Sequence, residues 1–191
     1  MSKLLKIINS NNIDLSKIDV FVETGLYAGD TLNDLKIQNI LDKFKNVYSI
    51  EIEKRLIDMA YQKYPFFNVD KNIEIINGDS SVELKSIINK HKQDKVLFWL
   101  DAHFSGQGTG KSQTFGECPL LGELDLISKL NIKPIIIIDD ITLFIDFPES
   151  IKHNHDINDW PNINKIKEKI ESLNFDLKIK IDTDLSYLIA Y

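Results

Sequence analysis

The chain has 191 residues, of which 43% are hydrophobic and 27% charged, and 29 acidic against 23 basic side chains give it a formal net charge of −6. This composition is typical of one soluble globular domain, and we expect residues 1–191 to form it. The acidic balance argues against a protein whose main task is to bind nucleic-acid phosphates. No apolar run reaches the roughly 20 residues that cross a bilayer, and a single cysteine, Cys118, is typical of a reducing compartment, so we expect a cytoplasmic protein.

Short runs of apolar, often β-branched residues alternate with segments of helical periodicity along most of the chain. The runs predict strands at 20–22, 47–50, 73–76, 96–100 and 134–138, and the segments between them predict helices at 31–44, 54–64, 81–90 and 117–130. Because the runs are apolar at successive positions, each strand should be buried on both faces, as in a parallel sheet covered by helices. The sequence therefore predicts an α/β fold with an open, doubly wound sheet.

The end of the chain has a different pattern. A helix is predicted from about 161 to 173, followed by strands at 175–181 and 187–191, and the turn-rich segment between these strands is too short for a crossover helix. The two strands should therefore be antiparallel neighbours. We expect seven strands in a mostly parallel, Rossmann-like sheet that ends in an antiparallel pair.

Ligands of such sheets bind at the carboxyl ends of the strands, and in this chain those ends carry acidic residues. The first strand leads into a loop that starts with Glu23 and Thr24 and whose glycines allow a tight turn before the next helix. The following strands end at Glu51, Asp79-Ser80, Asp101-Ala102-His103 and Asp139-Asp140. Five strands should thus place carboxylates along one edge of the sheet.

These residues resemble the motifs of the class I S-adenosylmethionine-dependent methyltransferases, over a range from about residue 19 to the C-terminus. The loop E-T-G-L-Y-A-G-D-T is similar to the superfamily's first motif, which surrounds the methionine part of the cofactor. It fails the G-x-G-x-x-G pattern of nicotinamide sites, because Tyr27 stands two residues after Gly25. Glu51 matches the acidic residue that accepts hydrogen bonds from both ribose hydroxyls, and Asp79 the residue that accepts one from the adenine amino group. The resemblance implies a cofactor site made of Glu23, Thr24, Gly25, Tyr27, Gly29, Thr31, Glu51, Asp79, Ser80 and Asp101.

Asp101, His103 and the Asp139-Asp140 pair resemble the metal-dependent sugar O-methyltransferases of the macrocin and aminocoumarin type. The resemblance implies that Asp101, Asp139 and Asp140 hold Mg²⁺. It also implies that His103, where that family has Asp, is the general base, so that His103 and Asp101 are the catalytic residues. The implied reaction is transfer of a methyl group from S-adenosylmethionine to a hydroxyl of a small molecule or sugar. In the plainer alternative, Asp139 caps the next turn, Asp101 braces the following loop and His103 is a polar residue with satisfied hydrogen bonds.

Two further patterns concern loops near this edge. Residues 105–112 resemble a phosphate-binding loop, but Ser105 replaces its first glycine and no helix opens after it, so we expect a mobile loop over the site instead. His153 and His155 have the spacing of a zinc pair, but no further ligands complete the set, and a solvated loop is expected.

Glu117 and Trp160 lie close to the same edge in the predicted fold. A carboxylate in the first turn of a helix ordinarily offsets the helix dipole, which is the simpler interpretation of Glu117. Trp160 and the segment 144–159 follow the fifth strand and are candidates for the pocket of the methyl acceptor.

The sequence leaves two other functions open. One is a cofactor-binding module of methyltransferase type that transfers no methyl group, and the other is a metal-dependent enzyme acting on a nucleotide sugar. The expected partner is a small-molecule or sugar acceptor rather than nucleic acid or a membrane. Whether the chain forms a homodimer is left open.

Overall fold

Seven strands form one sheet in the computed structural model, which describes residues 2–191. Their bounds are β1 Val20–Thr24, β2 Asn46–Glu51, β3 Ile73–Asn77, β4 Val96–Leu100, β5 Ile135–Asp139, β6 Ile179–Asp182 and β7 Tyr187–Ala190. The strand order is β3-β2-β1-β4-β5-β7-β6; β1 to β5 run parallel, and β7 pairs antiparallel with both β5 and β6. The predicted α/β sheet, including its antiparallel end, is confirmed.

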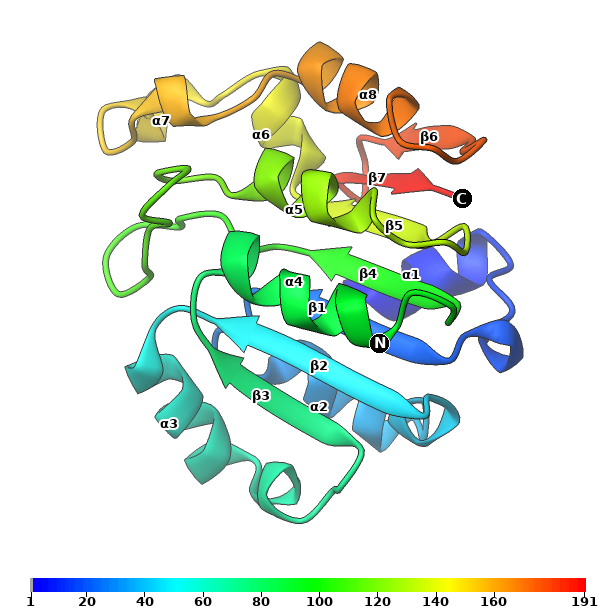
Figure 1. Ribbon diagram of the computed structural model, residues 1–191. Coiled ribbons are helices and arrows are strands. Elements are labelled where there is room, and N and C mark those ends of the chain that lie inside the picture. Colours follow the sequence, from blue (N-terminus) through cyan, green and yellow to red (C-terminus); the bar gives the residue numbers. More distant parts are fainter. Residues whose placement is uncertain (1) are drawn as a thin grey trace.

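Helices cover both faces of this sheet (Figure 1). Their bounds are α1 Lys3–Ser10, α2 Asp30–Ile37, α3 Lys54–Lys63, α4 Ser80–Lys90, α5 Leu120–Ile127, α6 Ile141–Ile145, α7 Glu149–Lys152 and α8 Ile163–Glu171. Helices α4, α5 and α8 pack on the face that includes Val22, whereas α1, α2 and α3 pack on the face that includes Phe21. Because both faces are covered, successive strand residues are buried, which explains the continuous apolar runs in the sequence.

No element is predicted before residue 20, yet residues 3–10 form α1. Ser2 is its N-cap, and the Ser2 hydroxyl accepts a hydrogen bond from the Leu5 backbone N–H (3.4 Å). The apolar side chains of the helix are buried against the sheet. A helix of eight residues is marginal by itself, so its formation depends on this packing rather than on local propensity.

Three predicted elements are shorter than their sequence patterns indicate. Helix α2 ends well before residue 44, because Asn39 adopts a left-handed backbone conformation (φ 55°) and a short 3₁₀ turn follows. Helix α5 begins only after Pro119, which occupies its N-cap. Strand β6 takes up only the end of the predicted strand 175–181, since the N–H groups of Phe175 and Leu177 donate to carbonyls two residues earlier instead of to a neighbouring strand.

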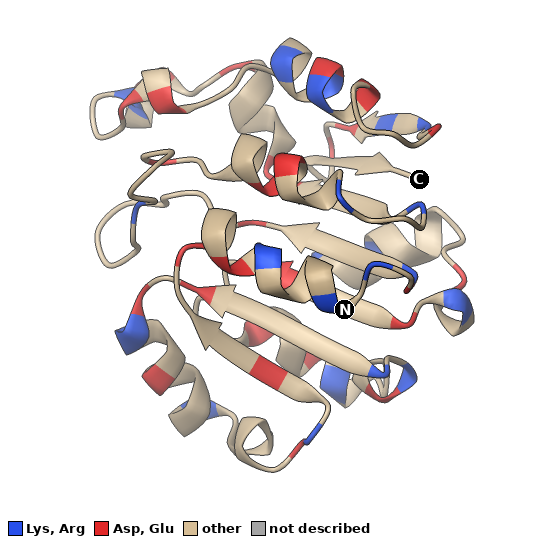
Figure 2. Cartoon of the chain, viewed as in Figure 1, with Lys and Arg blue, Asp and Glu red and all other residues tan. Residues whose placement is uncertain are grey.

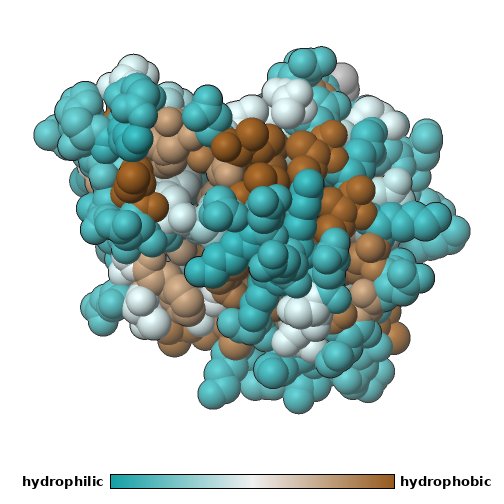
Figure 3. Space-filling model, turned by 90° about the horizontal axis from the view of Figure 1, so that it is seen from above, coloured by the Kyte–Doolittle hydropathy of each residue, from teal (hydrophilic) through white to brown (hydrophobic). Residues whose placement is uncertain are grey.

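The surface of the described chain is mixed in character. On the face seen in Figure 3, hydrophobic groups lie among hydrophilic side chains. Ile145, Ile151 and Ile157, in and near α6 and α7, are among the exposed apolar residues. Within residues 2–191, no helix has the length and apolar character that crossing a bilayer requires.

The carboxyl ends of β1 to β5 meet at one edge of the sheet, on the left in Figure 1. Figure 2 shows acidic residues gathered at this edge. The parallel arrangement therefore brings together the strand-end carboxylates that the sequence distributes over more than a hundred residues.

Candidate functional site

A pocket of about 380 Å³ opens at the carboxyl edge of the sheet, a size suited to a small-molecule ligand. Its walls come from the ends of β1 to β4 and from the loop after β4. Of the expected cofactor residues, those that line it are Gly25, Tyr27, Thr31, Glu51, Asp79, Ser80 and Asp101, while Glu23, Thr24 and Gly29 are buried behind its surface. His103 and Asp140 also line the pocket.

The loop between β1 and α2 forms a tight turn that requires glycine at its start. Gly25 has φ +86°, and a Cβ added there would lie 2.3 Å from the carbonyl oxygen of Asp101 on the neighbouring strand end. The Gly25 N–H donates to the Ile50 carbonyl (2.9 Å), which extends the pairing of β1 with β2 into the loop. Because Gly25 has no side chain, the loop backbone packs directly against the backbone of Asp101, and the pocket in front of the turn stays open to a ligand.

Glu51 is held at the pocket wall by two backbone donors. Its Oε1 accepts a hydrogen bond from the Glu53 N–H and its Oε2 one from the Tyr27 N–H, each at 2.9 Å. Burial raises the pKa of the Glu51 carboxyl, although these backbone donors oppose the shift. Each oxygen keeps a further acceptor position, so the carboxylate can bind two hydroxyl groups of a ligand.

Asp79 has two roles in the structure. It is the N-cap of α4, and its Oδ1 accepts hydrogen bonds from the N–H (3.0 Å) and hydroxyl (2.6 Å) of Ser81. Its Oδ2 accepts a bond from the Gln113 N–H (3.2 Å), on the loop that crosses the pocket. The neighbouring Ser80 donates its hydroxyl to the buried Glu123 (2.5 Å), away from the ligand space. Asp79 is thus confirmed as the N-cap of α4, and it also lines the pocket.

Glu23 carries a buried acceptor that has no partner. Its Oε2 accepts a hydrogen bond from the Ser49 hydroxyl (2.5 Å), but its Oε1 is without a hydrogen-bond partner among the described residues. Burial raises the pKa of the Glu23 carboxyl to about 8. A buried carboxylate oxygen without a partner is costly, and the raised pKa favours the neutral, protonated carboxyl, which lessens that cost.

Asp101, His103 and Asp140 form a compact cluster in the wall of the pocket. One ligand atom from each lies within 4.8 Å of the others, and His103 stands between the carboxylates, with Nδ1 3.4 Å from Asp101 and Nε2 3.6 Å from Asp140. Burial and the charges of Asp139 and Asp140 raise the pKa of Asp101, while burial lowers the pKa of His103. The set of two carboxylates and an imidazole fits a divalent cation or a proton relay.

Asp139, the remaining predicted metal ligand, lies next to this cluster but outside it. Its carboxylate forms an ion pair with Lys3 of α1 and accepts a hydrogen bond from the Asp140 N–H (2.7 Å). Burial raises the pKa of the Asp139 carboxyl to about 6, against the effect of the Lys3 hydrogen bond. Lys3 is a site residue that the sequence analysis misses, and its only local signal is the amphipathic pattern of residues 3–10 after a serine cap.

Glu117 is a buried hydrogen-bond centre, which corrects its interpretation as dipole compensation. It precedes α5 and so cannot stand in the helix's first turn. Its Oε1 accepts from Lys111 Nζ (2.7 Å), and its Oε2 accepts from Trp160 Nε1 (2.9 Å) and lies 2.8 Å from His155 Nδ1. Although burial alone would raise it, these bonds lower the pKa of Glu117 to about 2.

The expectation that His155 lies in a solvated loop is wrong. Only 7% of its side chain is exposed. Its ring contacts Phe104, Phe147 and Trp160, with ring centroids 5.3 to 5.8 Å apart. Trp160 in turn lies against His103, at 5.2 Å between centroids. The predicted acceptor segment thus packs beside the cluster at β4 and β5, although Trp160 does not itself line the pocket.

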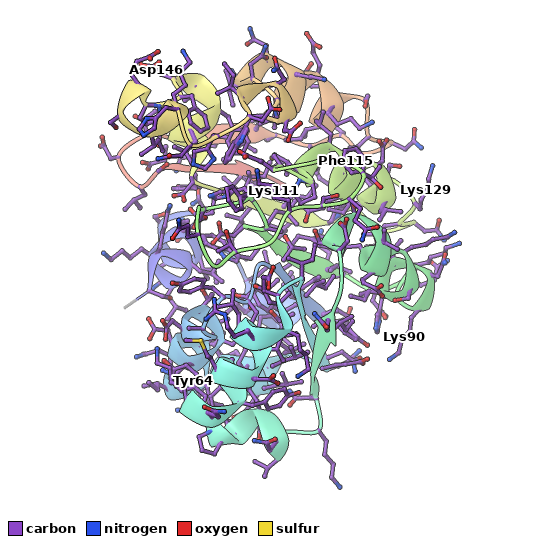
Figure 4. The ribbon with its side chains drawn as sticks, turned by 90° about the vertical axis from the view of Figure 1, so that its left-hand side faces the viewer. Tyr64, Lys90, Lys111, Phe115, Lys129 and Asp146 are labelled. Atoms are coloured by element: carbon purple, nitrogen blue, oxygen red, sulfur yellow. The ribbon has the colours of Figure 1, made fainter. Side chains whose placement is uncertain are left out.

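The loop after β4 extends across the pocket to the opposite wall. Figure 4 looks onto this edge, and Lys111 and Phe115 mark the loop between the α3 side, near Tyr64, and the α6 side, near Asp146. Arg55 of α3 donates from Nη2 to the Gly108 carbonyl (3.0 Å). No helix follows residues 105–112 directly, as expected, because a turn and an isolated bridge to Gly116 intervene before α5. The mobility of this loop stays a prediction.

Solved structures similar to this chain include several methyltransferases. No family model and no curated protein matches the sequence. Among solved structures, a putative caffeoyl-CoA O-methyltransferase from Staphylococcus aureus is similar at 18% identity and TM-score 0.61, covering 100% of this chain and 83% of that one. The methyltransferase PaMTH1 of Podospora anserina, bound to SAH, is similar at 14% identity and TM-score 0.64, covering 100% and 78%. A putative rRNA methylase from Clostridium thermocellum is similar at 12% identity and TM-score 0.59, covering 100% and 96%.

These similarities extend over the whole chain, which includes the seven-stranded sheet and its antiparallel end. The resemblance suggested by the strand-end motifs is therefore confirmed at the level of the fold. The chain has the fold of the class I S-adenosylmethionine-dependent methyltransferases.

Proposed function

We propose that this protein, acting as a single domain, is an S-adenosylmethionine-dependent methyltransferase that methylates a hydroxyl oxygen of a small molecule or sugar with the help of a divalent cation. The observation that carries the proposal is Glu51, which presents a carboxylate fixed by two backbone donors to the pocket of a methyltransferase fold. Hydroxyl groups of a ribose suit such an acceptor.

The other pocket residues support the same cofactor. The turn at Gly25 leaves room for the methionine part of the cofactor. Asp79, which follows β3 and lines the pocket, would accept a hydrogen bond from the adenine amino group. The cofactor would thus lie along the ends of β1, β2 and β3, with its methyl group toward β4.

The chemistry at β4 and β5 requires positioning and removal of a proton. The sulfonium is already an activated donor, so in the transfer the acceptor oxygen forms a bond to the methyl carbon while the sulfur–carbon bond breaks. His103 takes the hydroxyl proton, and the flanking carboxylates of Asp101 and Asp140 stabilise the imidazolium that forms.

A divalent ion fits the same residues. Asp101 and Asp140 would hold Mg²⁺, and Asp139 would join them if Lys3 released it. When bound, the ion would supply a positive charge that makes the acceptor hydroxyl more acidic. The methyl acceptor is a small molecule in this proposal, because the acidic chain does not suit a nucleic-acid acceptor.

Calorimetric titration of S-adenosylhomocysteine into the purified protein tests the cofactor site. We expect micromolar binding, weakened about 100-fold by Glu51→Ala, because two hydrogen bonds to a charged group are lost. Glu74→Ala, at an exposed position of β3 that does not line the pocket, should bind like the wild type. No binding by the wild type, or tighter binding of a nucleoside diphosphate sugar, would refute the proposal.

A further inference from the structure

The ion pair between Lys3 and the end of β5 joins two parts of the chain that are far apart in sequence. Lys3 Nζ contacts the Asp139 carboxylate directly and lies 3.2 Å from Asp140 Oδ1. The lysine side chain is 30% exposed and that of Asp139 only 10%, so the contact is partly shielded from solvent. The attraction between the two charges is therefore screened less than in an exposed surface ion pair, and removing one partner leaves the other charge uncompensated.

Helix α1 holds Lys3 in place. Its side chains Leu4, Leu5, Ile7 and Ile8 are buried in the core, and at its C-terminal end Asn11 donates to the Tyr187 hydroxyl (2.9 Å). Asn11 also accepts a hydrogen bond from Lys180 Nζ (3.0 Å). The ammonium group is therefore presented by a packed helix anchored to β6 and β7 rather than by a loose end.

The site has an excess of negative charge around this ammonium. Asp101, Asp139 and Asp140 lie at adjacent strand ends, and Glu23 adds a fourth carboxyl close enough to affect Asp101. Within residues 2–191, no lysine or arginine other than Lys3 forms an ion pair with any of the three aspartates. The other carboxylate oxygen of Asp140, Oδ2, lies 3.6 Å from His103 Nε2.

We propose that Lys3 is a resident counter-ion of this site, which holds Asp139 and Asp140 in place when no divalent ion is bound and competes with such an ion for them. The proposal rests on the proposed function, because it concerns the cation site of that reaction. A bound ion shares Asp140 with the ammonium and can gain Asp139 only if Lys3 releases that carboxylate, so the presence of Lys3 weakens metal binding. Lys3 is accordingly a positioning residue that sets how strongly the chain depends on divalent cations.

The test uses Mn²⁺ alone and needs neither cofactor nor acceptor. Calorimetric and thermal-shift titrations would compare wild type with Lys3→Met, Lys3→Arg and Lys6→Met, the last being an exposed lysine of the same helix. We expect Lys3→Met to lower the melting temperature of the metal-free protein and to bind Mn²⁺ about tenfold more tightly, because one positive charge is removed from close range. Lys3→Arg keeps the positive charge. This variant and Lys6→Met should match the wild type in melting temperature and in Mn²⁺ affinity.

Two results would overturn the proposal. One is a metal-free melting temperature of Lys3→Met equal to that of Lys6→Met, which would show that the ammonium holds nothing in place. The other is Mn²⁺ affinity no tighter in Lys3→Met than in wild type, including no binding in either, which would remove the competition. Failure of the proposed function is distinguishable, since it is read from a separate titration with S-adenosylhomocysteine that contains no divalent ion.

Discussion

Glu117→Gln should destabilise the protein through the two loops that this carboxylate joins. Only 1% of Glu117 is exposed, and its oxygens bond to donors on the loop after β4 and on the segment before α8. A glutamine keeps the shape but carries no charge, and one of its two terminal groups is an N–H donor instead of an acceptor. Either the Lys111 ammonium or the Trp160 N–H then faces a donor, and the ion pair with Lys111 is lost in both orientations.

The size of the effect follows from the lowered pKa. Burial would raise the pKa of Glu117, but the donated hydrogen bonds bring it from 4.5 to about 2, which corresponds to about 3 kcal/mol. Because the cluster lies just beneath surface loops, solvent screening reduces the expected loss to about 2 kcal/mol at pH 7. The folded-state pKa is lowered, so this stabilisation is present above pH 4.5 and is lost as the pH falls from 4.5 toward 2.

Urea denaturation at pH 7, 5, 4 and 3 measures the loss, and hydrogen exchange of the amides in 144–160 shows whether these loops open separately from the rest. Glu149→Gln is the control, since Glu149 forms an exposed ion pair with Lys152 and should cost well under about 1 kcal/mol. Equal stability and equal exchange in the two variants at pH 7 would refute the reasoning. A deficit in Glu117→Gln that stays unchanged down to pH 3 would also refute it.

Two further substitutions test the turn and the buried carboxyl behind the pocket. Gly25→Ala should lower stability by more than about 2 kcal/mol, because strain at positive φ adds to a Cβ 2.3 Å from the Asp101 carbonyl oxygen. Gly106→Ala, with φ +106° and open space around its Cβ, should cost only the strain, and equal melting temperatures in the two variants would contradict this. The folded-state pKa of Glu23, about 8, is raised, so the wild type should lose stability as the pH rises from 4.5 to 8. Glu23→Gln should remove at least about 1 kcal/mol of that loss. The measurement is the free energy of unfolding in urea between pH 4.5 and 8, and parallel pH profiles of wild type and variant would contradict the prediction.

Much of the fold follows from local patterns. Continuous apolar runs require strands buried on both faces, and their alternation with helices leaves a parallel sheet as the natural arrangement. Once strands are parallel, their carboxyl ends must share an edge, so Glu51, Asp79, Asp101 and the Asp139-Asp140 pair could be expected around one pocket. Element ends were harder to place, because periodicity continues past Asn39 while a left-handed backbone there ends the helix.

By itself, the sequence determined the order of strands and helices and the acidic edge, because these depend on residue types at short spacing. Only the tertiary structure decided which charges meet. Lys3 lies 136 residues from Asp139, and Glu117 lies 38 and 43 residues from His155 and Trp160, and no local pattern records these pairs. They form because packing of α1 and of the segment before α8 brings polar side chains into buried positions, where each must find a partner of opposite character.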